Sequence, residues 1–231
     1  MNAVSGSADE TLGQATTETM RLHAGYLARR TWFEWLFALV VAVGGLFALQ
    51  RYADAMDVYE KGILLAAIPA AVWLGWFWRP LQTLMLVVAG LSLAAVFSYQ
   101  GTLERAETVF WLKYFLSSQS AILWMSMLFF MSTVFYWIGV FAKGRAEGME
   151  LIASRLVWVA VTMALTGTMV RWYESYLLGA DIGHIPVSNL YEVFVLFCWM
   201  TAAFYLYFEA QYKTRSLGAF VMLVVLSLIH I

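Results

Sequence analysis

The residues best suited to chemistry are grouped in a short polar stretch, residues 183–192, directly before a long apolar run. His184 provides an imidazole, which can bind a metal ion or exchange a proton near neutral pH. An imidazole at the edge of a hydrophobic pocket can serve as a ligand of a metal or metal-containing cofactor, whereas a loop histidine can equally hydrogen-bond the end of a helix. Asn189 and Glu192 add an amide and a carboxylate beside it. We therefore take this stretch as the candidate binding site.

Glu192 has two interpretations that the sequence leaves open. Asn189 followed by Glu192 and an apolar run is typical of a capping box, in which the two side chains bond the free amides that open a helix. A carboxylate just inside a membrane boundary is also costly unless it is paired, which favours a functional charge. Arg171 is the candidate partner, although it could instead extend to lipid headgroups or face an acidic group of a ligand.

Long apolar segments must position this stretch. Hydrophobic residues make up 62% of the 231 residues and charged residues only 13%. The apolar residues cluster in runs of about 17 to 22, the length that crosses a bilayer. The sequence therefore predicts an all-α fold, a polytopic transmembrane helix bundle. Its six complete spans are expected near residues 32–49, 62–78, 81–99, 121–142, 152–170 and 187–208.

The two ends of the sequence differ from these spans. Residues 1–30 begin with a polar, Ser- and Thr-rich stretch and are predicted to be a cytosolic tail. Residues 31–231 are predicted to form the transmembrane domain. A seventh apolar run starts at Leu217 and is too short to cross comfortably, so we expect an incomplete seventh span.

Basic residues predict the orientation, because cytoplasmic loops are enriched in Lys and Arg. With the amino terminus inside, nine basic residues fall on the inner side and five on the outer side. The inner set is Arg21, Arg29, Arg30, Arg79, Lys143, Arg145, Arg155, Lys213 and Arg215. The candidate site then lies on the outer face, in a loop expected over residues 171–186.

Two shorter patterns carry structural predictions. Glu34 lies four residues after Arg30, which favours an ion pair along one helix face. Charged residues alternate with large apolar ones over residues 100–120, which is typical of a helix lying at the membrane interface or capping the bundle. Neither pattern by itself indicates a catalytic group.

Composition excludes several classes of function. A net charge of −1 predicts no nucleic-acid partner. Cys198 is the single cysteine, so the chain has neither an internal disulfide nor a Cys-x-x-Cys thiol relay. The three histidines are scattered along the sequence and predict no metal site. We expect membrane lipid to surround the helix bundle.

The pattern Gly-His-x-Pro-x-Ser-Asn-Leu-Tyr-Glu at residues 183–192, after Arg171-Trp172-Tyr173-Glu174, resembles the CcsA/ResC-type proteins, also named CcsB, of system II cytochrome c biogenesis. These belong to the haem-handling superfamily that includes CcmC and CcmF. Nearly the whole chain resembles the amino-terminal part of such proteins, including residues 110–137. Trp73, Trp76 and Trp78 resemble the family's tryptophan-rich motif in spacing, but Arg79 stands where that motif has aspartate, so an aromatic belt is the better interpretation.

The resemblance implies a function in the bacterial cytoplasmic (inner) membrane. Family members carry haem across it and present the haem to apocytochrome c, acting with a ResB-type partner as part of a cytochrome c synthetase complex rather than as a stand-alone enzyme. Haem is the implied cofactor, with His184, Glu192, Arg171 and Asn189 as candidate contacts. The family's haem-ligating histidines flank the tryptophan-rich motif, which the resemblance places downstream of this sequence.

Two other classes stay open as alternatives. A membrane transporter would use polar residues and broken helices near the bilayer midplane, where this sequence offers mainly Thr162, Thr166 and Thr168. A membrane electron-transfer subunit would need histidine ligands inside the complete spans, where the sequence has none.

Overall fold

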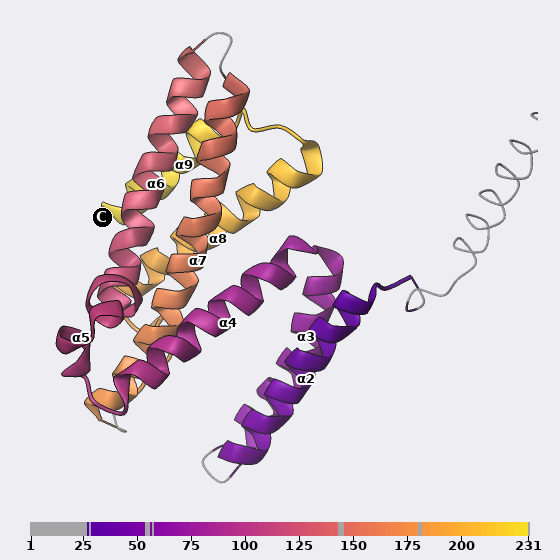
Figure 1. Cartoon of the computed structure of the whole chain (residues 1–231), viewed down its shortest axis with the longest axis vertical. Coiled ribbons are helices and arrows are strands. Elements are labelled where there is room, and N and C mark those ends of the chain that lie inside the picture. Colours follow the sequence, from indigo (N-terminus) through magenta and orange to yellow (C-terminus); the bar gives the residue numbers. More distant parts are fainter. Residues whose placement is uncertain are drawn as a thin grey trace, which may run out of the picture. The chain divides into compact units, whose positions relative to one another are not determined.

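The protein is described by a computed structural model, which covers residues 27, 29–53, 56, 58–142, 146–179 and 182–230. Within these ranges all regular elements are helical, and Figure 1 shows their course. Six helices are long and apolar enough to cross a membrane, which confirms the predicted all-α, multi-pass fold. They are α2 (Trp32–Tyr52), α3 (Val58–Phe77), α4 (Pro80–Tyr99), α6 (Ser118–Phe141), α7 (Ala146–Leu178) and α8 (Leu190–Tyr212).

Three shorter elements complete the described structure: α5 (Arg105–Thr108), the π-helix η1 (Leu112–Leu116) and α9 (Gly218–Ile229). The last is apolar but shorter than the six spans, as the sequence predicts. The chain divides into two compact units, Met1–Thr83 and Leu84–Ile231.

In the first unit α2 and α3 lie side by side (Figure 1). Close contact depends on glycine at two positions. A Cβ at Gly45 would come within 2.5 Å of the Ile68 side chain, and one at Gly75 within 2.5 Å of the Phe37 ring. Thr31 and Glu34 form a full capping box at the start of α2, so the helix begins at Trp32 as predicted.

The second unit is built on the packing of α6 against α7, with α8 and α9 beside them (Figure 1). Phe129, Met125, Val157 and Val161 are buried in its core. At one end a further cluster joins α4, η1 and α7 through Tyr99, Leu112 and Val170. This cluster holds the end of the unit where the candidate site lies.

The fifth span is longer than the sequence predicts. The 33 residues of α7 extend about 50 Å at about 1.5 Å per residue, well beyond a hydrocarbon core of about 30 Å. The expected loop over residues 171–186 is therefore wrong in its first half, because Arg171 to Leu178 are helical. Polar side chains end a membrane span but do not end a helix, and no Gly or Pro occurs in residues 171–178.

The sixth span begins slightly later than predicted, at Leu190 rather than residue 187, because Pro186 and Val187 lie in a turn.

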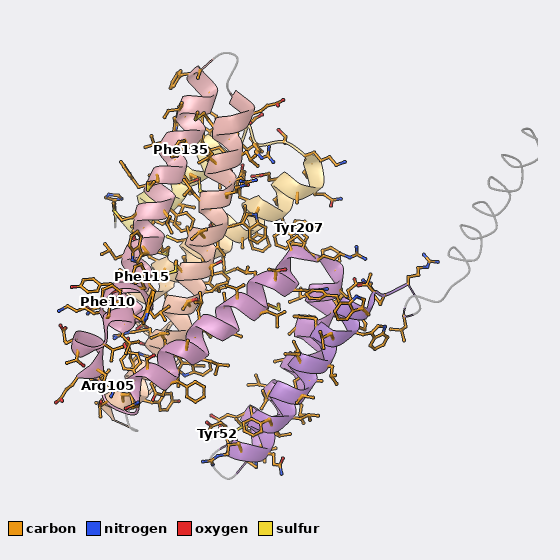
Figure 2. All side chains as sticks on the ribbon, viewed as in Figure 1. Tyr52, Arg105, Phe110, Phe115, Phe135 and Tyr207 are labelled. Atoms are coloured by element: carbon orange, nitrogen blue, oxygen red, sulfur yellow. The ribbon has the colours of Figure 1, made fainter. Side chains whose placement is uncertain are left out.

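Residues 100–120 do not form one continuous interfacial helix. Gln100 and Gly101 have positive φ angles of 47° and 80° and end α4 in a turn. The chain then forms α5, η1 and the first turn of α6 in succession. Figure 2 shows Phe110 and Phe115 on this broken segment, and their rings lie 6.3 Å apart. The aromatic side chains hold together a compact cap instead of a straight amphipathic helix.

Candidate functional site

Glu192 is the centre of the candidate site. It lies in the first turn of α8, and Asn189 caps that helix by accepting a 2.9 Å hydrogen bond from the Glu192 backbone N–H. Although helix ends are normally solvated, only 4% of Glu192 is exposed. A buried carboxylate is costly unless hydrogen-bond donors or a positive charge lie beside it.

The Glu192 carboxylate finds these donors on both sides. Its Oε2 accepts 3.1 Å hydrogen bonds from the backbone N–H and the hydroxyl of Ser188. Its Oε1 lies 3.4 Å from Nε of Arg171. The capping-box prediction is thus confirmed for Asn189 but wrong for Glu192, whose side chain extends past the Asn189 N–H to Ser188. The predicted partnership with Arg171 is present as an ion pair.

Arg171 reaches this site from the last turns of α7. Its side chain is 36% exposed, and of its five N–H groups only the one on Nε bonds Glu192 within the described part of the chain. The guanidinium therefore neutralises a buried carboxylate, and its terminal N–H groups make no other bond within the described part of the chain. A carboxylate or phosphate of a ligand could accept bonds from them.

His184 has a defined orientation in the loop between α7 and α8. Its Nδ1 lies 2.7 Å from the carbonyl oxygen of Ile182, and because a carbonyl only accepts, Nδ1 carries a proton. Its Nε2 lies 3.8 Å from Oε2 of Glu192. In the neutral ring Nε2 keeps a free lone pair for a metal, and in the protonated ring it forms an ion pair with Glu192.

Ser175 fixes this histidine from α7. The Ser175 hydroxyl donates to the Trp172 carbonyl at 2.7 Å and accepts the His184 backbone N–H at 3.2 Å. Gly183 packs directly against the Tyr176 ring, so that a Cβ at that position would overlap the ring. The loop is therefore pinned to the exposed end of α7.

A second buried carboxylate, Glu174, escaped the sequence analysis as a site residue. It accepts hydrogen bonds of 2.5 Å from the Tyr99 hydroxyl and from the Ser118 hydroxyl, and one of 3.0 Å from the Ser118 N–H. Glu174 is 7% exposed, and these donors are neutral. Its position three residues after Arg171 and one before Ser175 places all three on one face of α7, which was the available clue. Its partners on α4 and α6 are too distant in sequence to predict.

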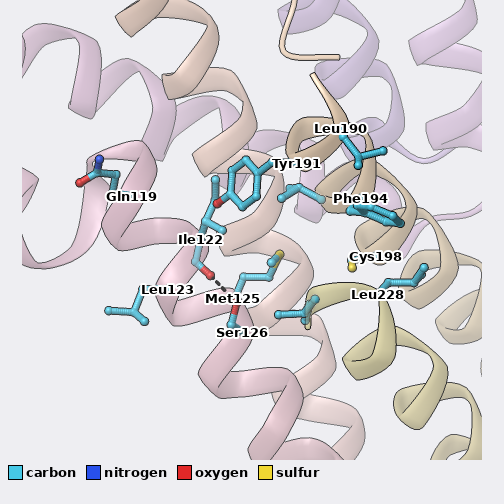
Figure 3. A pocket seen from close by; sticks show the side chains of 12 residues that line it. Gln119, Ile122, Leu123, Met125, Ser126, Leu190, Tyr191, Phe194, Cys198 and Leu228 are labelled. Carbon is cyan, nitrogen blue, oxygen red and sulfur yellow. Dashed lines mark hydrogen bonds between the residues drawn. The ribbon is translucent and has the colours of Figure 1, made fainter. Parts of the chain in front are cut away.

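An apolar groove of about 570 Å³ lies beside the site, between α6, α8 and α9. In Figure 3 Tyr191 and Phe194 of α8 and Ile122 and Met125 of α6 line the same hollow. Polar groups are few and include Gln119 and Ser126. A mostly apolar hollow with a few polar groups is typical of a site for a hydrophobic ligand. Tyr191 directly precedes Glu192 on α8, so the groove comes within one residue of the charged cluster, although Glu192, Arg171 and His184 do not themselves line it.

Comparison with known proteins adds an independent observation. Over 107 residues the chain is 29% identical to the cytochrome c biogenesis protein CcsA of Chlorella vulgaris, covering 45% of this chain and 30% of that protein. It is 33% identical to CcsA of Pyropia yezoensis over 85 residues, or 36% of this chain and 24% of that protein. It is 32% identical to CcsA of Gloeobacter violaceus over 100 residues, which cover 42% of this chain and 27% of that protein.

This chain is a homologue of the CcsA-type proteins. The matched region spans less than a third of the length of these CcsA relatives. No family model and no solved structure matches the chain. The homology agrees with the resemblance found in the sequence and with the six helices that can cross a membrane.

Proposed function

We propose that this chain serves cytochrome c maturation by handling haem for its attachment to apocytochrome c on the outer side of the bacterial cytoplasmic membrane. One observation carries the proposal: in a CcsA homologue, the buried Glu192 contacts Arg171 and His184 at the start of a membrane-spanning helix, next in sequence to Tyr191, which lines an apolar groove. A haem has an apolar ring, a metal and acidic edge groups, and these three features match the groove, the imidazole and the guanidinium.

Each residue then has a distinct task. Arg171 binds a propionate through its terminal N–H groups while its Nε stays on Glu192. His184 offers Nε2 towards the metal, because Nδ1 is already engaged with Ile182. Glu192 holds both side chains in place, and Asn189 fixes the start of α8 from which Glu192 extends. The bond-forming chemistry belongs to the haem and the apoprotein, and these residues bind and orient the cofactor.

The partners follow from this task. Apocytochrome c supplies the Cys-x-x-Cys-His acceptor, and a ResB-type membrane protein completes the synthetase. This chain contributes binding and orientation rather than thiol chemistry, since its one cysteine, Cys198, is buried between helices.

The test replaces Glu192 by glutamine, which keeps the shape and removes the charge. We expect Glu192→Gln to lower the yield of covalent cytochrome c clearly at normal protein abundance, because Arg171 loses its counter-ion near the membrane boundary. His184→Ala should have a smaller effect. Yield is measured by haem staining and normalised to the amount of the variant protein.

Glu209→Gln is the matched control. Glu209 is a shielded glutamate near the other end of α8, paired with Arg215 at 2.9 Å, so it tests the loss of a comparable charge away from the site. We expect its yield per protein to stay unchanged. Normal maturation in Glu192→Gln would leave Glu192 with only a structural role, holding Ser188 before the start of α8, and would remove the main support for this function.

A further inference from the structure

Three exposed aromatic side chains lie together on the cap between α4 and α6. Phe110, Trp111 and Tyr114 are 60%, 59% and 52% exposed, and these three residues form the aromatic patch. The Phe110 ring centre lies 5.6 Å from that of Trp111 and 5.1 Å from that of Tyr114. Large apolar groups gathered on a surface mark a place where a protein meets another molecule or a membrane.

The patch lies beside the ends of two helices that can cross a membrane. Tyr99 ends α4 and Ser118 starts α6, and the hydroxyl groups of both donate to the carboxylate of Glu174. The two helix ends are therefore at one level. Leu112, which directly follows Trp111, is buried in the same cluster as Tyr99. The cap is thus held against the span ends, where the membrane core ends.

The patch is continuous with the exposed apolar face of α6. The Trp111 ring centre lies 5.6 Å from that of Phe115, and the Phe115 ring stacks on Trp124 of α6 at 5.8 Å. Trp124 is itself exposed, and so are Leu123 and Met127 on this spanning helix. Exposed apolar side chains of a spanning helix face the lipid chains, and Trp and Tyr are enriched where those chains meet the headgroups. The patch therefore extends the lipid-facing surface of α6 towards the headgroups.

The backbone beside the patch suits such a position. Backbone groups without a partner are costly where water is scarce. Two carbonyl groups of η1 have partners on α6: the carbonyl oxygen of Lys113 accepts the Ser120 hydroxyl at 2.6 Å, and that of Tyr114 accepts Nε1 of Trp124 at 2.8 Å. These bonds let the rings enter the membrane boundary without stranding those carbonyl groups.

The charges of the cap indicate what kind of surface it meets. Two acidic and two basic side chains balance each other over residues 100–117: Glu104, Glu107, Arg105 and Lys113. Nε of Arg105 is turned back to the end of α4, where it bonds the Ser98 carbonyl oxygen at 2.9 Å. A cap without net charge gains little from an anionic surface, so the aromatic rings must supply the attraction.

We propose that the aromatic patch anchors the cap in the headgroup region of the bilayer that the helices cross. The rings of Phe110 and Trp111 lie where headgroups meet acyl chains, and phospholipid without net charge is sufficient to hold them. This inference is independent of the proposed haem handling and of which side of the membrane the cap faces.

Nitroxide labels on the whole protein in phosphatidylcholine nanodiscs measure the depth of the patch. Trp111→Cys is labelled in a Cys198→Ser background, and its collisions with oxygen, which concentrates in lipid, are compared with those with a water-soluble nickel complex. Glu104→Cys is the matched control, because Glu104 is an exposed carboxylate on the same cap. We expect the ratio of oxygen to nickel collisions to be several-fold higher at residue 111 than at residue 104. Added phosphatidylglycerol should leave this ratio unchanged.

A second measurement keeps an aromatic ring at every position of the patch. Phosphatidylcholine with a doxyl group near the headgroup or near the chain end quenches tryptophan at the corresponding depth. The difference between the wild type and Trp111→Phe isolates the fluorescence of Trp111. We expect the doxyl group near the headgroup to quench it more strongly than the one near the chain end.

Three results would overturn the proposal. Equal ratios at residues 111 and 104 would place the patch in water, free for a partner protein. Quenching of Trp111 by neither lipid, or more strongly by the doxyl group near the chain end, would exclude the headgroup region. Insertion that requires phosphatidylglycerol would show that charge, and not the aromatic rings, holds the cap.

Discussion

Glu192 and Glu174 are buried at the same end of the second unit, yet different groups stabilise them. Glu192 has a cation beside it, whereas Glu174 relies on the hydroxyl groups of Tyr99 and Ser118 and one backbone N–H. A buried carboxylate that accepts several hydrogen bonds is sensitive to the loss of an acceptor, because its donors are then left unpaired. Glu174 thereby ties α4 and α6 to the end of α7 that carries the site.

This arrangement predicts the effect of Glu174→Gln. The amide N–H₂ would face donors instead of accepting from them, so we expect the free energy of unfolding to fall by about 1–3 kcal/mol. Tyr99→Phe should cost about 1 kcal/mol, since one bond is lost. Tyr114→Phe, at an exposed tyrosine, is the control and should change little. Unfolding in mild detergent with a chemical denaturant measures all three, and equal stability of Glu174→Gln and the wild type would contradict the role given to Glu174.

At the level of elements, the long α7 is what places the site. Its last turns continue beyond the membrane core and carry Arg171, Glu174 and Ser175 on one face. The following loop is pinned to this face by the bond between Ser175 and His184. Gly183 allows the loop to approach because it has no side chain to meet Tyr176.

The loop contact predicts that Gly183→Ala will disturb the site. The added methyl group overlaps the Tyr176 ring, so the loop must move and the His184 N–H loses Ser175. We expect faster hydrogen exchange over residues 182–189 and lower cytochrome c maturation. Gly148→Ala on the first turns of α7 is the control, because nothing lies within 4 Å of its added Cβ. Unchanged exchange in Gly183→Ala would show that the loop is not held by this contact.

At the level of the whole molecule, the second unit has a polar cluster at each end. Tyr99, Ser118 and Glu174 meet at one end. At the other end Glu209 accepts hydrogen bonds from Tyr136 at 3.1 Å and Ser154 at 2.7 Å. These bonds require α6, α7 and α8 to run alternately up and down, as successive membrane spans do.

The charge count predicts which end is outside. Cysteine is introduced at Ala146, the first residue of α7, or at Ile182, in the loop after α7, in a Cys198→Ser background. We expect a membrane-impermeant thiol reagent to label Ile182→Cys in intact cells and to label Ala146→Cys only after the membrane is opened, because basic residues are enriched on the cytoplasmic side. The reverse pattern would invert the topology and place the candidate haem site in the cytoplasm.

The sequence by itself determined the features that depend on neighbouring residues. Apolar runs of spanning length predicted the six membrane helices, and the spacing of Arg30 and Glu34 predicted their ion pair. Asn189 predicted where α8 starts, because a cap is a local hydrogen bond. The end of α7 was missed, because the change to polar residues marks the membrane boundary and not the end of the helix.

Only the tertiary structure decided which helix faces meet. A helix in lipid is apolar on all sides, so its sequence carries little periodicity to indicate the face that packs against protein. The bonds of Glu174 to Tyr99 and Ser118 therefore could not be predicted, nor could the bond of Arg79 to Glu34. The groove beside Tyr191 likewise exists because α6, α8 and α9 come together there. Each of these features depends on the position of side chains many residues apart, which folding alone brings within bonding distance.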